Sequence, residues 1–358
     1  MLRGSQQLFI LVFTCFIGLF MSCNKSEIGP QNVKDDALFE IESAGSLLIA
    51  CEGNFSQANP SLSQYDIQSM SVNNNVYQSI NGMGLGDVFQ SICEIDESLY
   101  FIINNSSKII KVDKATLVSQ DEIILSGRSP RYMVSANNNQ SFISNLVLSP
   151  DGAPVYIDVM DNQNNEIIDS INVGEWTEEM LVLEDVLYAC VMGGSEVVAI
   201  NVNSHEIIET YMVGKEPISI VKDKDDSIWV LCTGGFDEEL PSLWKIDVLN
   251  DTITELSFDT IESYPNSLTI NGSKDSLYFL NDGVYKMSID SDSITDELFI
   301  SQGAGSFYAL GVDPMTNEVY ASDPNGFQGT GFILRYSANG SLINEFEVGV
   351  IPSYFYFN

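Results

Sequence analysis

Residues Val213–Asp247 read VGKEPISIVKDKDDSIWVLCTGGFDEELPSLWKID. This stretch holds three short apolar runs, rich in isoleucine, valine, leucine and tryptophan, and turn-forming aspartate, glycine, serine or proline bounds each run. Runs of this length and composition predict β-strands joined by tight turns. The second run begins with the pair Ile228–Trp229, and the third ends at Asp247, whose carboxylate can bond the backbone of a hairpin. The stretch therefore predicts three consecutive antiparallel strands.

The same pattern recurs along the chain. In each copy an apolar pair, aromatic in most copies, begins one strand, and a short polar residue ends the next. Equivalent polar residues lie 40 to 48 residues apart. A repeat of this length is typical of β-propellers, in which each copy forms one four-stranded blade. Seven copies are found, with the polar residues Asp66, Asp113, Asp161, Asn201, Asp247, Asp290 and Ser337. The sequence therefore predicts an all-β, seven-bladed propeller; a pair of β-sandwiches, the alternative, does not explain the regular period.

The first copy lacks an inner strand of its own. The C-terminal segment Pro352–Phe357 is a strand-like run with no copy to follow it. We expect this segment to become the inner strand of the first blade, because ring closure protects sheet edges that would otherwise be exposed.

The first 22 residues are similar to a secretion signal. Arg3 supplies a positive charge, and Leu8–Phe20 is an apolar run of 13 residues, too short for a good membrane span. The run ends just before Cys23, as in bacterial lipoproteins. We therefore expect Cys23 to be lipidated and to anchor the protein to the outer membrane, with the cell surface as its location; an ordinary signal peptide is the alternative. Residues 23–45 predict a flexible tether, which leaves 46–358 for the propeller.

Charge and composition narrow the possible functions. The 358 residues include 15 Lys and Arg against 50 Asp and Glu, a formal net charge of −35. Such a field disfavours nucleic acid and anionic membrane surfaces, so we expect membrane contact through the lipid alone. His205 is the single histidine in the sequence and falls in a predicted hairpin turn. Because there is only this one histidine, a His-rich metal site is excluded. Its place in a turn leaves a serine nucleophile without a histidine base. We expect a protein that is not an enzyme and has no metal or cofactor.

Four cysteines follow the signal: Cys51, Cys93, Cys190 and Cys232. Each lies in a strand-like apolar run, which predicts buried free thiols. A disulfide between Cys190 and Cys232 is the alternative, because an oxidising compartment permits it.

The face of the propeller at which the inner strands begin carries long and uneven loops, and such loops on a rigid scaffold often hold binding residues. The first residues of the inner strands should line the mouth of the central channel: Gln90, Arg131, Glu178, Ile218, Asn266, Tyr308 and Ser353. Aromatic, amide and carboxylate side chains of the loops suit a bulky, partly apolar ligand. The loop candidates are Glu52, Asn54, Phe55, Asp87, Phe89, Trp176, Phe236, Phe307, Asp323 and Phe327. For Arg131 an ion pair with Glu178 on the next blade is the alternative role.

Several motifs resemble one protein family. The segments Glu52–Phe55 (EGNF), Leu85–Asp87 (LGD) and Pro130–Met133 (PRYM), with a recurrent Val-Gly before inner strands, are similar to YncE-like seven-bladed propeller lipoproteins of the Bacteroides–Flavobacterium lineage. That family includes the cobalamin-capturing lipoprotein BtuG. The resemblance covers nearly all of residues 46–358. It implies binding roles for the residues that match the motifs: Glu52, Asn54, Asp87, Gln90, Arg131 and Glu178.

The resemblance implies capture of a scarce nutrient outside the cell and its transfer to a TonB-dependent outer-membrane receptor. A corrinoid such as cobalamin is the first expected ligand, and a ferric siderophore is the second. The negative charge suits a neutral or cationic metal complex better than an anionic one. Two alternatives are a surface propeller that binds a protein or glycan without a small ligand, and a lactonase- or lyase-like enzyme.

Overall fold

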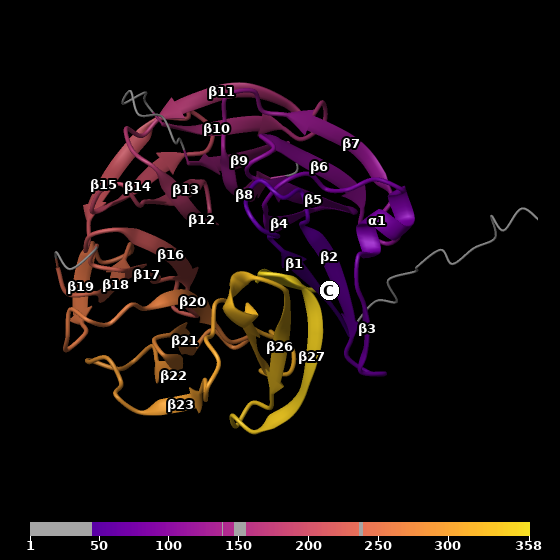
Figure 1. Cartoon of the computed structure of the whole chain (residues 1–358). Coiled ribbons are helices and arrows are strands. Elements are labelled where there is room, and N and C mark those ends of the chain that lie inside the picture. The colour runs from indigo at the N-terminus through magenta and orange to yellow at the C-terminus, as the bar shows by residue number, and fades with distance from the viewer. Residues whose placement is uncertain (1–44, 138, 147–154, 236–238) are drawn as a thin grey trace, which may run out of the picture. The chain divides into compact units, whose positions relative to one another are not determined.

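The computed structural model describes residues 45–137, 139–146, 155–235 and 239–358, and these residues form seven four-stranded antiparallel sheets. The sheets follow one another around a ring (Figure 1), because the inner strand of each contacts the inner strand of the next. The predicted seven-bladed propeller is therefore confirmed. The predicted signal peptide (1–22), Cys23 and all but the last residue of the tether (23–45) lie outside the described residues.

The strands are numbered in chain order, and each blade runs from its inner to its outer strand. Blade 1 consists of β28 (Pro352–Phe357), β1 (Ser46–Cys51), β2 (Ser61–Asp66) and β3 (Ser71–Asn73); blade 2 of β4 (Phe89–Ile95), β5 (Ser98–Ile103), β6 (Lys108–Asp113) and β7 (Ser119–Ile124). Blade 3 consists of β8 (Pro130–Asn137), β9 (Gln140–Asn145), β10 (Tyr156–Asp161) and β11 (Glu166–Asn172); blade 4 of β12 (Thr177–Leu183), β13 (Val186–Val191), β14 (Glu196–Asn201) and β15 (Ile207–Met212). Blade 5 consists of β16 (Pro217–Lys222), β17 (Ile228–Cys232), β18 (Ser242–Asp247) and β19 (Thr252–Ser257); blade 6 of β20 (Asn266–Ile270), β21 (Ser276–Leu280), β22 (Gly283–Ser288) and β23 (Leu298–Ser301). Blade 7 consists of β24 (Leu310–Val312), β25 (Val319–Asp323), β26 (Thr330–Tyr336) and β27 (Leu342–Val350).

The C-terminal strand closes the ring, as predicted. β28 pairs antiparallel with β1, with Phe357 opposite Leu47 and Phe355 opposite Ile49. Phe357 also packs on Tyr320 of blade 7, with ring centroids 5.4 Å apart. The last strand of the chain therefore joins the first blade to the seventh.

The aromatic residues of the predicted pairs form much of the core between neighbouring sheets. Tyr100, Trp229, Tyr278 and Tyr320 are at most 1% exposed. Burying a large apolar side chain stabilises a fold by roughly 1.5–3 kcal/mol. The indole of Trp229 also needs a partner, and it donates a hydrogen bond of 2.9 Å to the buried carboxylate of Asp223.

A β-bulge near the start of the inner strand recurs around the ring. The pairing register shifts between Pro130 and Met133 in β8, between Thr177 and Met180 in β12, and between Asn266 and Thr269 in β20. β4 and β16 show the same shift, and so does the pairing of β28 with β1. A bulge re-aims the side chains beside it, so two adjacent residues of one strand can face the channel.

Two short helical segments interrupt the strands: α1 (Val76–Asn81) and the 3-10 helix η1 (Asn325–Phe327). α1 follows the short strand β3 and buries Val76 and Tyr77. The sequence did not predict it, because six residues are too few for a helical period to show. Among the described residues, no helix is long and apolar enough to cross a membrane.

The four described cysteines are free and buried, as expected, and the alternative Cys190–Cys232 disulfide is not formed. Two of them lie beside the glycine of the Val-Gly motif at Gly214 and Gly349, whereas a Cβ on Gly174, the third such glycine, would meet open space. A Cβ on Gly349 would lie 2.9 Å from the Cβ of Cys51, and a Cβ on Gly214 would lie 3.0 Å from that of Cys232. Glycine therefore lets the chain that connects two blades pass close to a strand end of the second blade.

A glycine also fixes the contact between blades 6 and 7. Gly272 lies in the β20–β21 turn, and a Cβ there would overlap the backbone carbonyl of Pro314. We expect Gly272→Ala to destabilise the protein by about 2 kcal/mol in urea unfolding, because backbone cannot move aside as a side-chain end can. Gly329→Ala is the matched control, with open space around its Cβ and an expected change within about 0.5 kcal/mol. Equal stabilities of the two variants would show that the Pro314 contact does not restrict this position.

Candidate functional site

A cavity of about 1110 Å³ lies among the seven inner strands. Polar side chains at the starts of these strands line its mouth, and apolar side chains such as Met133, Met180 and Leu268 line it farther along the strands. Several candidates predicted from the sequence line this cavity: Glu52, Phe55, Gln90, Arg131, Glu178, Ile218, Asn266, Tyr308 and Ser353. The structure therefore brings the predicted channel-mouth residues together.

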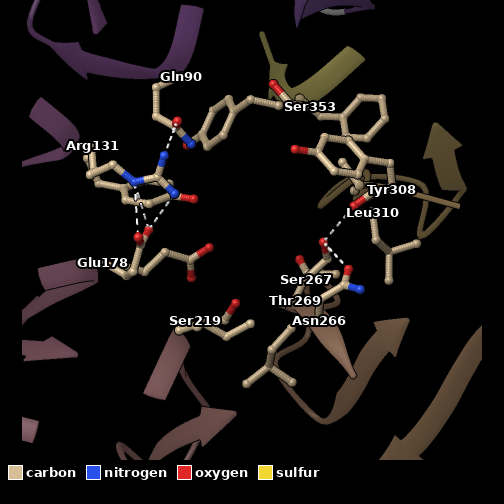
Figure 2. A pocket seen from close by; sticks show the side chains of 18 of the residues that line it. Gln90, Arg131, Glu178, Ser219, Asn266, Ser267, Thr269, Tyr308, Leu310 and Ser353 are labelled. Atoms are coloured by element: carbon tan, nitrogen blue, oxygen red, sulfur yellow. Dashed lines mark hydrogen bonds and ion pairs between the residues drawn. The ribbon is translucent and has the colours of Figure 1, made fainter. Parts of the chain in front are cut away.

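Arg131 forms the centre of one side of the cavity (Figure 2). Its Nε donates to Glu178 Oε1 at 3.0 Å, and its Nη2 donates to Glu178 Oε2 at 3.0 Å. Its Nη1 donates to the side-chain oxygen of Gln90. Arg131 comes from β8, Glu178 from β12 and Gln90 from β4, so one guanidinium connects three neighbouring blades. The ion pair expected as the alternative role of Arg131 is present.

Glu52 and Tyr308 occupy a second part of the mouth. Glu52 directly follows β1, and the Tyr308 hydroxyl donates to its Oε1 at 3.2 Å. Burial raises the pKa of Glu52, and the positive charge of Arg131 offsets part of that rise. Burial and the Glu52 carboxylate both raise the pKa of Tyr308, so its hydroxyl keeps its proton and remains a donor. Asn266 and Ser267 lie on the same side as Tyr308 in Figure 2.

The backbone around Glu52 is strained. Val88 and Ile351 have φ values of +62° and +54°, a left-handed region that β-branched residues rarely adopt. Both residues line the cavity. The Glu52 N–H donates to the Ile351 carbonyl at 2.8 Å, and the Glu52 carbonyl accepts from the Phe89 N–H at 3.3 Å. These hydrogen bonds fix the position of Glu52 at the mouth of the cavity.

The bulges add cavity-lining residues that the sequence analysis missed: Tyr132, Glu179, Ser219, Ser267 and Tyr354. Each follows a predicted channel-mouth residue directly. In a regular strand this following residue would lie on the opposite face, away from the channel. The sequence analysis therefore did not predict that it lines the cavity. Prolines at the starts of β8, β16 and β28 are the one sequence signal, because proline cannot donate a ladder hydrogen bond and is tolerated at strand starts and bulges.

Glu179 is the least compensated charge in the cavity. The Ile220 N–H donates to its Oε2 at 3.1 Å, and no salt bridge to Glu179 is present among the described residues. Burial, with a smaller contribution from the neighbouring Glu178 carboxylate, raises the pKa of Glu179 to about 8, and the bonds from Ile220 and Ser219 and the charge of Arg131 offset part of the rise. Glu179 is therefore largely protonated at neutral pH.

Most loop candidates hold the loops together and do not line the cavity. The Asn54 side chain donates to the Phe327 carbonyl at 2.8 Å, and the Phe327 ring lies edge-on to Tyr308. Asp87 accepts from the Ser56 N–H at 2.9 Å, and Asp323 accepts from the Asn325 N–H at 2.8 Å. Phe55 differs from them, because it lines the cavity and is 63% exposed.

Three aromatic candidates lie elsewhere. Phe89 and Phe307 are 0% and 8% exposed, so their expected place in exposed loops was wrong. Both pack in the core between sheets. Residues of a neighbouring blade bury these two rings, and the local sequence does not show that contact. Trp176 is half-buried and does not line the cavity. Phe236 lies outside the described residues.

Comparison with known protein families identifies the chain. A family described as "Domain of unknown function (DUF5074)" matches residues 45–358, which include every described strand. The chain belongs to the DUF5074 family. A search of curated protein sequences found no match.

Solved structures similar to this DUF5074 protein share its fold. A quinonprotein alcohol dehydrogenase-like protein from Bacteroides thetaiotaomicron has 16% identity and a TM-score of 0.68, over 87% of this chain and 78% of that one. A protein from Lactobacillus plantarum has 14% identity and a TM-score of 0.66, over 88% and 99%. A putative 6-phosphogluconolactonase from Bacteroides fragilis has 12% identity and a TM-score of 0.64, over 88% and 98%. At these identities the likeness shows the propeller fold alone, and no specific likeness to BtuG is shown.

The chemistry of this DUF5074 site differs from that of a nucleophile–histidine pair. His205 lies in the turn between β14 and β15 and bonds Asp169 at 2.7 Å, and it is absent from the cavity lining. Among the described residues, no group of three or more His, Cys, Asp or Glu side chains is arranged to hold a metal ion. The cavity instead offers carboxylates, tyrosines and one arginine, which suit recognition by charge and hydrogen bonds.

Proposed function

We propose that this DUF5074 propeller is a lipid-anchored outer-membrane protein, exposed at the cell surface, that captures a scarce bulky nutrient and passes it to a TonB-dependent receptor. The observation that carries the proposal is the cavity itself. Its volume of about 1110 Å³ exceeds that of most pockets for drug-sized ligands, which have roughly 300–1,000 Å³. Its mouth combines aromatic and polar groups, as expected for a large ligand with an apolar body and a polar edge.

The lipid anchor and the receptor are supported by the sequence around Cys23 and by the family resemblance. A corrinoid is the first proposed ligand and a ferric siderophore the second. The proposed role is binding without catalysis. The net charge of −35 supports neutral or cationic complexes.

Absorbance-monitored equilibrium dialysis tests the nutrient with four coloured probes: cyanocobalamin, cobinamide, cationic ferrioxamine B and anionic ferric enterobactin. We expect one corrinoid or ferrioxamine B to bind with one-to-one stoichiometry. Phe55→Ala is expected to weaken that binding about tenfold, because buried aromatic contacts dominate such interfaces. Leu249→Ala is the matched control, since Leu249 is 77% exposed in the turn between β18 and β19, and neither it nor its chain neighbours line the cavity. Binding of none of the probes would overturn the nutrient proposal.

A second candidate function has its own observation. Phe55 and Phe327 are 63% and 44% exposed at the mouth, and exposed aromatic side chains are typical of protein and glycan interfaces. If no coloured probe binds and the protein co-purifies with a large partner that Phe55→Ala releases, recognition of a protein or glycan becomes the better account.

A further inference from the structure

We propose that the ligand of the channel carries a cationic nitrogen group, an ammonium or a guanidinium, which binds beside the carboxyl group of Glu179. This inference rests on the proposed function, because it names the chemical class of ligand for the same cavity. It is carried by the charges that line the cavity, by the state of Arg131 and by the surroundings of Glu179.

The charges of the cavity do not balance. Among the described residues, four charged side chains line it: Glu52, Arg131, Glu178 and Glu179. With Glu179 protonated, one positive and two negative charges leave a net charge of −1, and ionisation of Glu179 makes it −2. The Arg131 charge is matched by the two-point bond to Glu178, and a third nitrogen donates to Gln90. An anionic ligand would have to break this arrangement, whereas a cationic ligand supplies the missing charge.

The surroundings of Glu179 suit an organic cation. The Tyr132 and Tyr354 side chains line the cavity, and the Glu179 charge acts on both phenols. Tyrosine rings attract ammonium and guanidinium groups through their electron-rich faces. The Arg131 guanidinium already lies 5.9 Å from the centroid of the Tyr132 ring, so we assign the ligand cation to the Tyr354 side. The Ile220 N–H donates to Oε2, so the carboxyl group is oriented before a ligand arrives. The carboxyl group of Glu179 and the Tyr354 ring therefore form a subsite for a cation.

The proton balance of binding follows from this environment. A neutral Glu179 carboxyl group and a cationic ligand give a carboxylate–cation pair, and one proton leaves to solvent. The titratable and charged groups that act on Glu179 are Glu178 on its own strand, Arg131 and Tyr132 on β8, Tyr354 on β28 and Cys190 on β13. Arg131 stays paired, and burial raises the pKa values of both phenols and of the thiol. The pKa of about 8 places the titration of Glu179 between pH 6.5 and 9.

Choline and its uncharged carbon analogue 3,3-dimethylbutan-1-ol test the inference, because they match in shape and differ in a charge that does not titrate. In calorimetric titrations we expect choline affinity to rise roughly 30-fold from pH 6.5 to pH 9, the increase in ionised Glu179 for a pKa of about 8. The alcohol should show no such rise. In Glu179→Gln, which keeps an acceptor for the Ile220 N–H, the pH dependence should disappear. Glu166→Gln, exposed on β11, is the matched control and should behave as the wild-type protein does.

Infrared difference spectra provide a second measurement that needs no variant. Choline added to the wild-type protein at pH 6.5 should remove a carbonyl band of a neutral carboxylic acid and create a carboxylate band. Equal affinities for the two probes, choline binding that does not change with pH, or no choline binding would each overturn the inference. If choline fails while cyanocobalamin or ferrioxamine B binds, only this inference falls. If choline behaves as expected while no nutrient probe binds, only the nutrient proposal falls.

Discussion

Removal of Pro352–Asn358 is expected to abolish the cooperative unfolding transition of the protein. These residues form β28, the inner strand of the first blade, and its loss leaves the inner edge of β1 unpaired. Leu47 and Ile49, both 0% exposed, would then lie on an open apolar strand edge, which favours aggregation. The contacts of Phe355 and Phe357 with blade 7 would be lost as well. Circular dichroism and light scattering during a thermal ramp measure both effects.

A permuted chain is the control for this truncation. The end of β28 lies beside the start of β1, because the Asn358 N–H donates to the Ser46 carbonyl at 3.1 Å. An asparagine–glycine turn can therefore join Asn358 to Gly45, since such two-residue turns fit antiparallel hairpins. A chain that begins at Pro352, passes through this turn and ends at Ile351 is expected to regain a cooperative transition. A truncated protein with the unfolding midpoint of the full chain would show that ring closure is not needed for stability.

Arg131→Leu is expected to destabilise the protein by about 3–5 kcal/mol, because it leaves a buried carboxylate without its partner. The Glu178 side chain is 6% exposed, and burial already raises its pKa in the presence of Arg131. The loss should shrink as pH falls, since a protonated Glu178 carries no unpaired charge. Urea unfolding at pH 7.5 and at pH 5 measures the effect and its pH dependence.

The double variant Arg131→Leu/Glu178→Leu separates the unpaired charge from the loss of arginine packing. Replacing a buried ion pair by apolar side chains is often neutral, so most of the lost stability should return. If the double variant were as unstable as Arg131→Leu alone, the cost would lie in packing and in the bond to Gln90, and not in an unpaired Glu178 charge.

The fold could be predicted from the sequence because the pattern of apolar runs and polar turn residues is short and recurs in every blade. The period of the polar turn residues indicated the number of blades, and the unpaired run Pro352–Phe357 indicated the closure. α1 could not be predicted in the same way, because its six residues are placed by burial of Val76 and Tyr77 in a core that exists only after the blades assemble.

The candidate site could be predicted to within one residue along each inner strand. Arg131 and Glu178 line the cavity as expected. Their neighbours Tyr132 and Glu179 line it too, because a bulge interrupts the alternation of side chains between the two faces of a strand. The roles of Asp87 and Asn54 were beyond sequence reasoning. Each bonds a loop that is distant in the sequence, and only the folded ring brings those loops together.

The recurrent bulges have a consequence for how propellers of this family can diverge. They confine the variable chemistry to short windows such as Arg131–Tyr132 and Glu178–Glu179, while the strand ladders beyond them keep a constant register. Substitutions within these windows can reverse the charge of the channel lining or change the width of the channel without moving the sheets. One frame can thus be adapted to successive ligands by changes in a few codons per repeat.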